Sequence, residues 1–234
     1  MKVKFRCLPE LEPFLLPPVP AAQGLPQWLK DMPPKAASDV LGGVEVRTLK
    51  HCAPLLDAMQ TGVLFLLPCD VEVRGGEFVW QWELPRSARS RQTRSPIGVH
   101  VPEQASGMPG KADTDFVVKF NNFWTIETEP GVSMLFTHPL NRPDLPFHSF
   151  AGIVDTDAYS SGFVHFPAQW MDRSFEGVLP RGTPVAQGIP FRREQVQLDC
   201  AAMSETDVEF HSREQDLLQA DPGHYRKARR ASRS

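Results

Sequence analysis

The chain has 234 residues, of which 41% are hydrophobic and 23% charged, and a formal net charge of −3. This composition suits a globular protein with a sizeable core, and the charge excludes a general attraction for nucleic acid or an anionic membrane. The four cysteines include no CxxC pair, which excludes zinc-knuckle and thioredoxin-type motifs. The longest apolar run, Val63 to Pro68, is too short to span a membrane, and the N-terminal residues lack a signal-peptide core. We therefore expect a cytoplasmic protein with free thiols.

Residues 1–40 are rich in proline, which interrupts helices and favours extended chain. Large apolar side chains, among them Leu11, Leu15 and Leu29, are interspersed with the prolines. We expect an arm that packs along the body of the protein through these side chains, with one short helical turn over 25–32. The alternative is a PxxP ligand for a partner domain.

Residues 41–199 carry the pattern of a β domain. Alternating polar and apolar residues in short segments, punctuated by glycine and proline, predict short strands, and Gly75-Gly76 predicts a hairpin turn. We expect a mainly β fold, either β-clip-like or a small barrel or sandwich. The expected strands cover 44–47, 63–67, 71–74, 77–83, 116–120, 124–129, 134–137, 149–154, 163–166 and 185–189, and 54–60 is expected to be helical.

Residues 85–113 interrupt this pattern and predict a long exposed loop. Arg86, Arg89, Arg91 and Arg94 fall in its first part. The loop is either a solvated excursion or a device that grips an anion.

Residues 200–234 are polar and predict a helix over 212–220, followed by a basic tail. The last eleven residues contain five basic side chains, and we expect them to be disordered. Only this tail is a candidate for contact with nucleic acid.

Titratable side chains concentrate between Thr137 and His165. Such groups are costly to bury unpaired, so their density marks a solvated rim or a site. A type I turn would equally account for Asp155 and Asp157, and an ion pair with Asp144 or Asp157 would account for Arg142.

Three segments of this region resemble motifs of the dUTPase and dCTP-deaminase superfamily, whose members have a β-clip fold. They are EPGVSML at 129–135, GIVDTDAY at 152–159 and PRGTPVAQGI at 180–189. The resemblance covers residues 115–193, and the chain as a whole also resembles a bacterial protein family of unassigned function. The resemblance implies a homo-oligomer in which Asp155 is the catalytic carboxylate. The candidate residues for contact with a small-molecule ligand are Asn141, Arg142, Asp157, Tyr159 and Gln187, and of these Tyr159 matches the aromatic residue that follows the carboxylate in the superfamily.

Two departures from the superfamily concern the phosphate-binding parts. Its arginine–serine motif is replaced here by Leu140-Asn141-Arg142-Pro143, and its C-terminal glycine-rich lid is replaced by the basic tail. The leading hypothesis is therefore binding, or hydrolysis, of an anionic nucleotide-like molecule.

Two alternatives remain open. The first is a metal-dependent enzyme in which His138, His148 and His165, with Asp155, hold a divalent ion such as magnesium, iron or zinc. The second is a non-catalytic structural or interaction protein.

Overall fold

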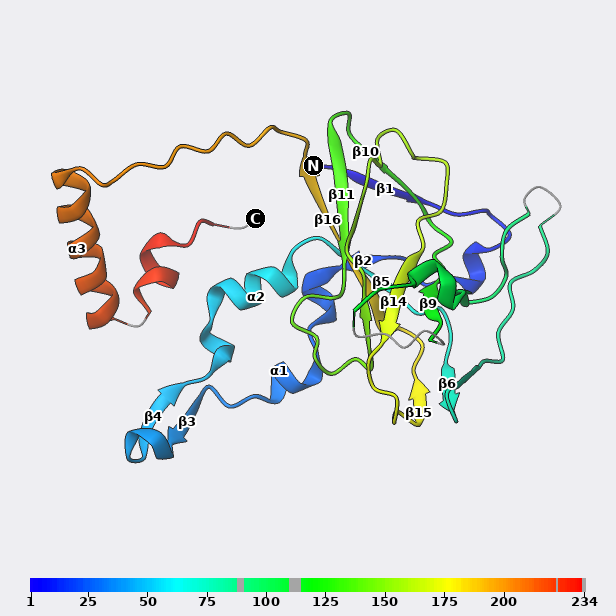
Figure 1. Ribbon diagram of the computed structural model, residues 1–234, viewed down its shortest axis with the longest axis horizontal. Coiled ribbons are helices and arrows are strands. Elements are labelled where there is room, and N and C mark those ends of the chain that lie inside the picture. Colours follow the sequence, from blue (N-terminus) through cyan, green and yellow to red (C-terminus); the bar gives the residue numbers. More distant parts are fainter. Residues whose placement is uncertain (88–90, 110–114, 222, 233–234) are drawn as a thin grey trace. The chain divides into compact units, whose positions relative to one another are not determined.

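The computed structural model describes residues 1–87, 91–109, 115–221 and 223–232 (Figure 1). The chain divides into two compact units, Met1–Arg193 and Glu194–Ser234. It is mainly β, as the short alternating segments predicted, and its strands form several antiparallel sheets. No closed barrel is present among the sheets of the described ranges.

The largest sheet has five strands in the order β13 (Gly152–Val154), β11 (Val132–Thr137), β16 (Pro184–Arg192), β5 (Val63–Leu66) and β2 (Val19–Pro20). On β11, Met134 lies opposite Val154 of β13 and Pro190 of β16. Met134 is fully buried, so this strand forms part of the core of unit 1.

A second sheet packs against the first through aromatic side chains. Its strands follow the order β12 (Phe147–Ser149), β14 (Phe166–Trp170), β9 (Val117–Phe120) and β8 (Ile97–His100). The rings of Phe65 and Phe166, one from each sheet, have centroids 4.8 Å apart. The smaller sheets are β15 (Gly177–Leu179) with β6 (Val71–Arg74) and β7 (Glu77–Val79), β1 (Val3–Arg6) with β10 (Thr125–Thr128), and β3 (Lys35–Ser38) with β4 (Val44–Arg47).

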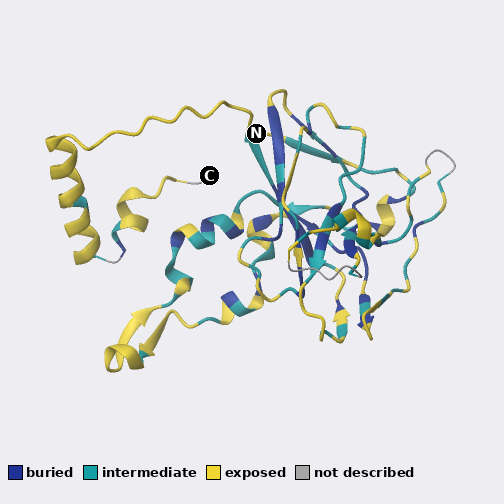
Figure 2. Cartoon of the chain, viewed as in Figure 1, coloured by how far each residue is buried: buried dark blue, intermediate teal, exposed yellow. Residues whose placement is uncertain are grey.

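The N-terminal arm packs through its apolar side chains. Leu11 and Leu15 are buried against Leu84 and Phe123 in a second core cluster, and Figure 2 shows buried segments along the arm. Its helical turns, together with the helix that follows it, are η1 (Glu12–Phe14), η2 (Ala21–Gly24), α1 (Gln27–Asp31), η3 (Asp39–Leu41), η4 (Leu49–His51) and α2 (Ala53–Gln60).

The predicted long loop over 85–113 is wrong in its second half. Ile97 is buried and pairs with Phe120, so residues after the arginines form strand β8, and η5 (Pro102–Ala105) follows it. The flanking glycines, prolines and serines favour a loop, but burial of an apolar side chain stabilises the strand by more than this preference. Arg89 lies outside the described residues.

Several strand boundaries also differ from the prediction, and three of the differences change the assignment of a segment. Residues 149–154 form no single strand, because Ser149 and Phe150 bond β14 of the second sheet whereas Gly152–Val154 pair with β11 of the first. The strand expected at 163–166 begins only at Phe166, and Phe163 makes an isolated bridge. The strand expected at 77–83 ends at Val79.

Unit 2 consists of a segment without regular structure, α3 (Glu205–Ala220) and the helical turn η6 (Tyr225–Arg229). The helix begins earlier than predicted because Ser204 and Asp207 form a capping box. The prediction of a disordered tail is wrong for the described part, since Arg229 and His224 both bond Glu214. These bonds, that from Arg229 foremost, lower the pKa of Glu214 to about 2.

No helix of the described ranges has the length and apolar character needed to cross a membrane.

Candidate functional site

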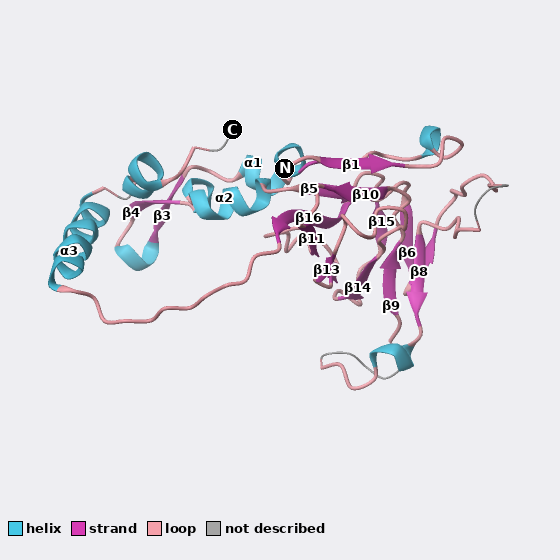
Figure 3. Cartoon of the chain, turned by 90° about the horizontal axis from the view of Figure 1, so that it is seen from above, coloured by secondary structure: helices cyan, strands magenta, loops and turns pink. Residues whose placement is uncertain are grey.

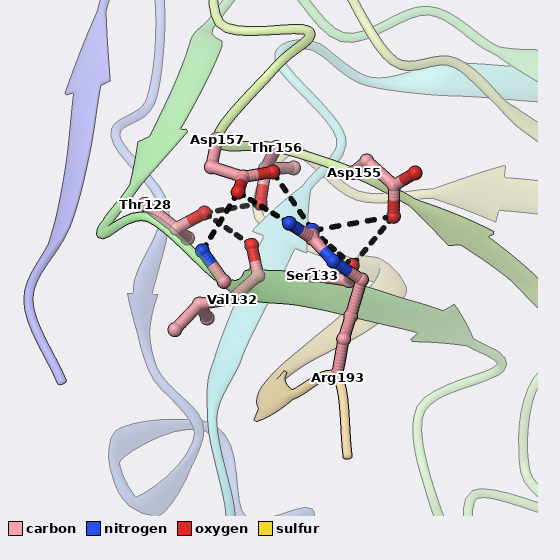
Figure 4. Close-up of polar contacts among 8 residues, drawn as sticks. Thr128, Val132, Ser133, Asp155, Thr156, Asp157 and Arg193 are labelled. Carbon is pink, nitrogen blue, oxygen red and sulfur yellow. Dashed lines mark hydrogen bonds and ion pairs between the residues drawn. The ribbon is translucent and has the colours of Figure 1, made fainter. Parts of the chain in front are cut away.

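Polar residues gather at both ends of strand β11. At its start, Ser133, Asp155, Asp157 and Arg193 form what we call the hairpin cluster (Figure 4). Beyond its end, His138, Arg142, Asp144 and His148 form what we call the loop cluster. The six residues of β11 separate the two clusters by about 17 Å along the strand. Asp155 and Arg142, which were predicted to share one site, therefore belong to different clusters.

A tight turn after β13 positions the hairpin cluster. The carbonyl of Asp155 accepts hydrogen bonds from the amides of Ala158 and Tyr159, at 3.0 and 2.8 Å. Thr128 donates its hydroxyl to the Val132 carbonyl, so the 2.7 Å contact between the Thr128 and Thr156 hydroxyls requires Thr156 to be the donor. Since Thr156 is fully buried, this bond anchors the turn to the neighbouring strands.

Asp157 and Arg193 hold the turn against the sheet. Arg193 follows β16 and donates from Nη1 to Asp157 Oδ1 at 2.8 Å and from Nη2 to Oδ2 at 2.5 Å. Asp157 also accepts the amide of Gly131 at 2.8 Å. The hydrogen bonds from Arg193 and Gly131 keep the pKa of the Asp157 carboxyl well below its ordinary value, while Asp157 raises the pKa of Arg193. Asp157 is thereby occupied within the protein.

Asp155 is oriented but remains open. Its Oδ1 accepts the hydroxyl of Ser133 at 2.6 Å and lies 3.4 Å from Nη1 of Arg193. No described residue hydrogen-bonds or pairs with Oδ2, and 61% of the side chain is exposed. Arg193 also donates to the Ser133 hydroxyl at 2.8 Å, which fixes the direction in which Ser133 donates.

Tyr159 lies in the same turn, and its ring is half exposed. The ring passes directly over Gly162, where a Cβ atom would come within 2.1 Å of the tyrosine hydroxyl oxygen. A glycine at this position therefore leaves room for the ring of Tyr159. The hairpin cluster thus presents an open carboxylate oxygen and an aromatic ring four residues apart in one turn.

The loop cluster is closed by its own ion pair. Arg142 donates from Nε to Asp144 Oδ1 at 2.8 Å and from Nη2 to Oδ2 at 2.7 Å, and the indole of Trp28 donates to Oδ1 at 3.1 Å. Burial acts to raise the pKa of Asp144, but the bonds from Arg142 and Trp28 outweigh it and lower that pKa. Of the two ion pairs expected for Arg142, the one with Asp144 is present.

Asn141 and Gln187 have local roles. Asn141 adopts a left-handed backbone with φ of 56° beside the ion pair and is exposed. Gln187 is buried, accepts the amide of Leu140 at 2.8 Å, and donates to the carbonyls of Ala58 and Thr61 at 2.9 and 2.6 Å. Gln187 therefore joins the end of α2 to the segment after β11, and both its amide atoms are engaged with backbone.

The three histidines are not brought together. His138 accepts the amide of Ser149 at Nδ1 and bonds the carbonyl of Arg142 through Nε2, so it is the Nε2–H tautomer. Its ring stacks on His148 at 4.5 Å, whereas His165 accepts the amide of Asn122 near the start of β14. Burial above all lowers the pKa values of His138 and His165. Across the described ranges, no three His, Cys, Asp or Glu side chains are placed to hold a metal ion.

No described arginine of residues 85–94 forms a hydrogen bond or an ion pair with either cluster. Arg94 donates to the Leu84 carbonyl and pairs with Glu83, so it stabilises its own segment. Arg86 and Arg91 are exposed.

Sequence reasoning missed Ser133 and Arg193. Ser133 lies inside the segment EPGVSML, and Arg193 lies four residues beyond PRGTPVAQGI. The sequence does place Arg193 just after a predicted strand. Only the pairing of that strand with its neighbours shows which carboxylate the side chain of Arg193 reaches.

In comparisons with known proteins, no family model and no curated protein matches the chain. The β-clip resemblance accordingly stays a prediction that depends on its three motifs.

Proposed function

We propose that the hairpin cluster binds a nucleoside-like small molecule. Asp155 Oδ2 accepts hydrogen bonds from ligand hydroxyl groups, and the ring of Tyr159 stacks on the ligand's ring. The supporting observation is that Ser133 and Arg193 orient one carboxylate oxygen of Asp155 while the other faces solvent. A preoriented acceptor loses little conformational freedom when it binds a ligand.

The proposal covers the nucleoside portion of the ligand and no hydrolytic step. A phosphate would need cationic partners, but Arg193 is engaged with Asp157 and Arg142 with Asp144. Asp155 is therefore assigned a binding role, and the motif resemblance supports the choice of a nucleoside over other hydroxyl-bearing rings.

The test is thermal melting with a panel of nucleosides, their monophosphates and ribose, followed by calorimetric titration of any compound that raises Tm. Asp155→Asn keeps the shape of the side chain and an acceptor for Ser133, but removes the charge. We expect about a tenfold or greater loss of affinity in this variant, because a hydrogen bond to a charged group contributes about 1.5–3 kcal/mol.

Asp199→Asn is the matched control, because Asp199 is exposed in the segment before α3. It should bind like the wild type. If no panel member raises Tm, or if Asp155→Asn binds as tightly as the wild type, the proposal is wrong.

A further inference from the structure

Unit 1 contains an apolar cavity that belongs to neither cluster. Its volume is about 320 Å³, and residues of β6, β7, β8, β9 and β14 line it. Figure 3 shows β6, β8 and β9 next to one another on this side of the unit. Its volume lies in the range of ordinary small-molecule sites, about 300–1,000 Å³.

Aromatic rings form the inner wall of the cavity. Trp170 makes edge-to-face contacts with Phe78, at 4.9 Å between ring centroids, and with Phe175, at 5.8 Å. The indole nitrogen of Trp170 donates to the carbonyl of Asp172 at 2.7 Å. Because this only polar atom of the ring is already bonded, the wall formed by Trp170 is apolar.

The rim of the cavity carries large apolar side chains that solvent reaches. Val99 is 50% exposed and Phe116 is 55% exposed. Exposed apolar groups that border a hollow mark a binding surface more often than scattered ones do. Among the described residues that line the cavity, the charged ones are Asp115 and Arg173, which form an ion pair with each other, and Gln169 is polar. These described charges therefore balance.

From this geometry we infer that the cavity binds an uncharged, largely apolar compound of one or two rings. In another protein an apolar cavity of about 150 Å³ binds benzene, and this one has about twice that volume. A charged ligand would lose its hydration there, and the charged side chains among the described lining residues already pair with each other. This site is separate from the hairpin cluster, so it goes beyond the proposed nucleoside binding.

The probe for the test is indole, a neutral two-ring compound, added to the full chain. Calorimetry should give a Kd of about 1 mM or tighter, which a ligand of this size can reach through apolar burial alone. Methyl-resolved NMR should show contacts between indole protons and the methyl groups of Val99 and Val117, which both line the cavity.

Two substitutions on neighbouring positions separate the cavity from the general surface. Val99→Trp places a large ring at the rim and should weaken indole binding at least tenfold. Val101→Trp is the matched control, because Val101 is similarly exposed but does not line the cavity, and it should leave the Kd unchanged. If Val99→Trp does not fold, Phe116→Ala takes its place and should weaken binding several-fold.

Three results would overturn the inference. The first is an absence of indole contacts to the Val99 and Val117 methyl groups. The second is equal indole affinity in the wild type, Val99→Trp and Phe116→Ala. The third is a dimer that Val99→Trp dissociates while indole leaves those methyl signals unchanged, since a second copy of the chain would then cover the cavity.

Discussion

The two ends of β11 carry similar residue types but use them differently. In the loop cluster, Arg142 and Asp144 neutralise each other and His138 has both ring nitrogens bonded to backbone. In the hairpin cluster, Asp157 and Arg193 close in the same way, but Asp155 keeps one carboxylate oxygen open. The comparison teaches that a dense polar segment marks a candidate site only where the local partners leave an acceptor unused.

The largest expected effect on stability concerns the end of β11 at which the loop cluster lies. Gln187→Leu keeps the side-chain volume but removes the partners of the Leu140 amide and the Thr61 carbonyl. The Ala58 carbonyl loses one of its two donors and keeps the amide of Thr61. Each of the two partly buried backbone groups left without a partner costs about 1–3 kcal/mol, so the free energy of unfolding should fall by about 4 kcal/mol. Urea denaturation measures this loss.

The control for Gln187→Leu is Gln81→Leu, at an exposed glutamine of the same unit. It should change stability by no more than about 0.5 kcal/mol. A loss below about 1 kcal/mol in Gln187→Leu would show that water replaces the missing bonds.

A smaller effect is expected from the ion pair of the loop cluster. Arg142→Met leaves Asp144 with Trp28 as its remaining side-chain donor. The arginine side chain is 12% exposed and the aspartate 35%, so the cost should lie between that of a buried and a surface pair, at about 2 kcal/mol. The double variant Arg142→Met/Asp144→Asn should recover part of this loss, and strictly additive losses would show that the two side chains do not interact.

The next expected effect is a pH dependence from His138. Its pKa is below the ordinary 6.5 because it is buried. The charges of His148 and Arg142 add to the lowering, while the hydrogen bond to the Arg142 carbonyl and the charge of Asp144 oppose it. The unfolded chain therefore binds the proton more readily than the native chain. The stability contributed by neutral His138 is complete above pH 6.5 and is lost as the pH falls below that value.

Unfolding free energies measured between pH 7.5 and about 5 test this prediction. His165 acts in the same direction, because its pKa is also lowered. His138→Asn should therefore reduce the slope of stability against pH without abolishing it. An unchanged slope would show that His138 does not titrate differently in the two states.

Much of the fold followed from local pattern. Strands β4 and β6 and the turn at Gly75-Gly76 were predictable because alternation and glycine act within a few residues. The split of 149–154 between two sheets was not, because it depends on pairing with two distant strands. Phe150 bonds Pro167, seventeen positions further along the chain, whereas Gly152–Val154 pair with β11. Strand β8 was hidden for a related reason, since its burial depends on pairing with β9.

The candidate site was predictable in part. The turn at Asp155 and Asp157 follows from residue preferences, and the pair between Arg142 and Asp144 joins residues two positions apart. The roles of Arg193 and Gln187 depend on contacts made 36 or more positions away along the chain. Residue type alone therefore suggested Gln187 as a ligand contact, whereas three backbone groups already use its amide.

The smallest expected effect on stability concerns the end of β11 at which the hairpin cluster lies. In Gly162→Ala, the new Cβ would lie 2.1 Å from the hydroxyl oxygen and from Cζ of Tyr159, so the ring must move. The obstructed atoms are the far end of a side chain that solvent already reaches, so the free energy of unfolding should change by less than about 1 kcal/mol. NMR contacts between the Tyr159 ring and residue 162 should weaken, and affinity for the nucleoside found in the panel should fall.

If stability instead drops by more than about 2 kcal/mol, Tyr159 holds the turn together. In that case Tyr159 would be a structural residue of the turn, and Asp155 alone would be left to meet a ligand.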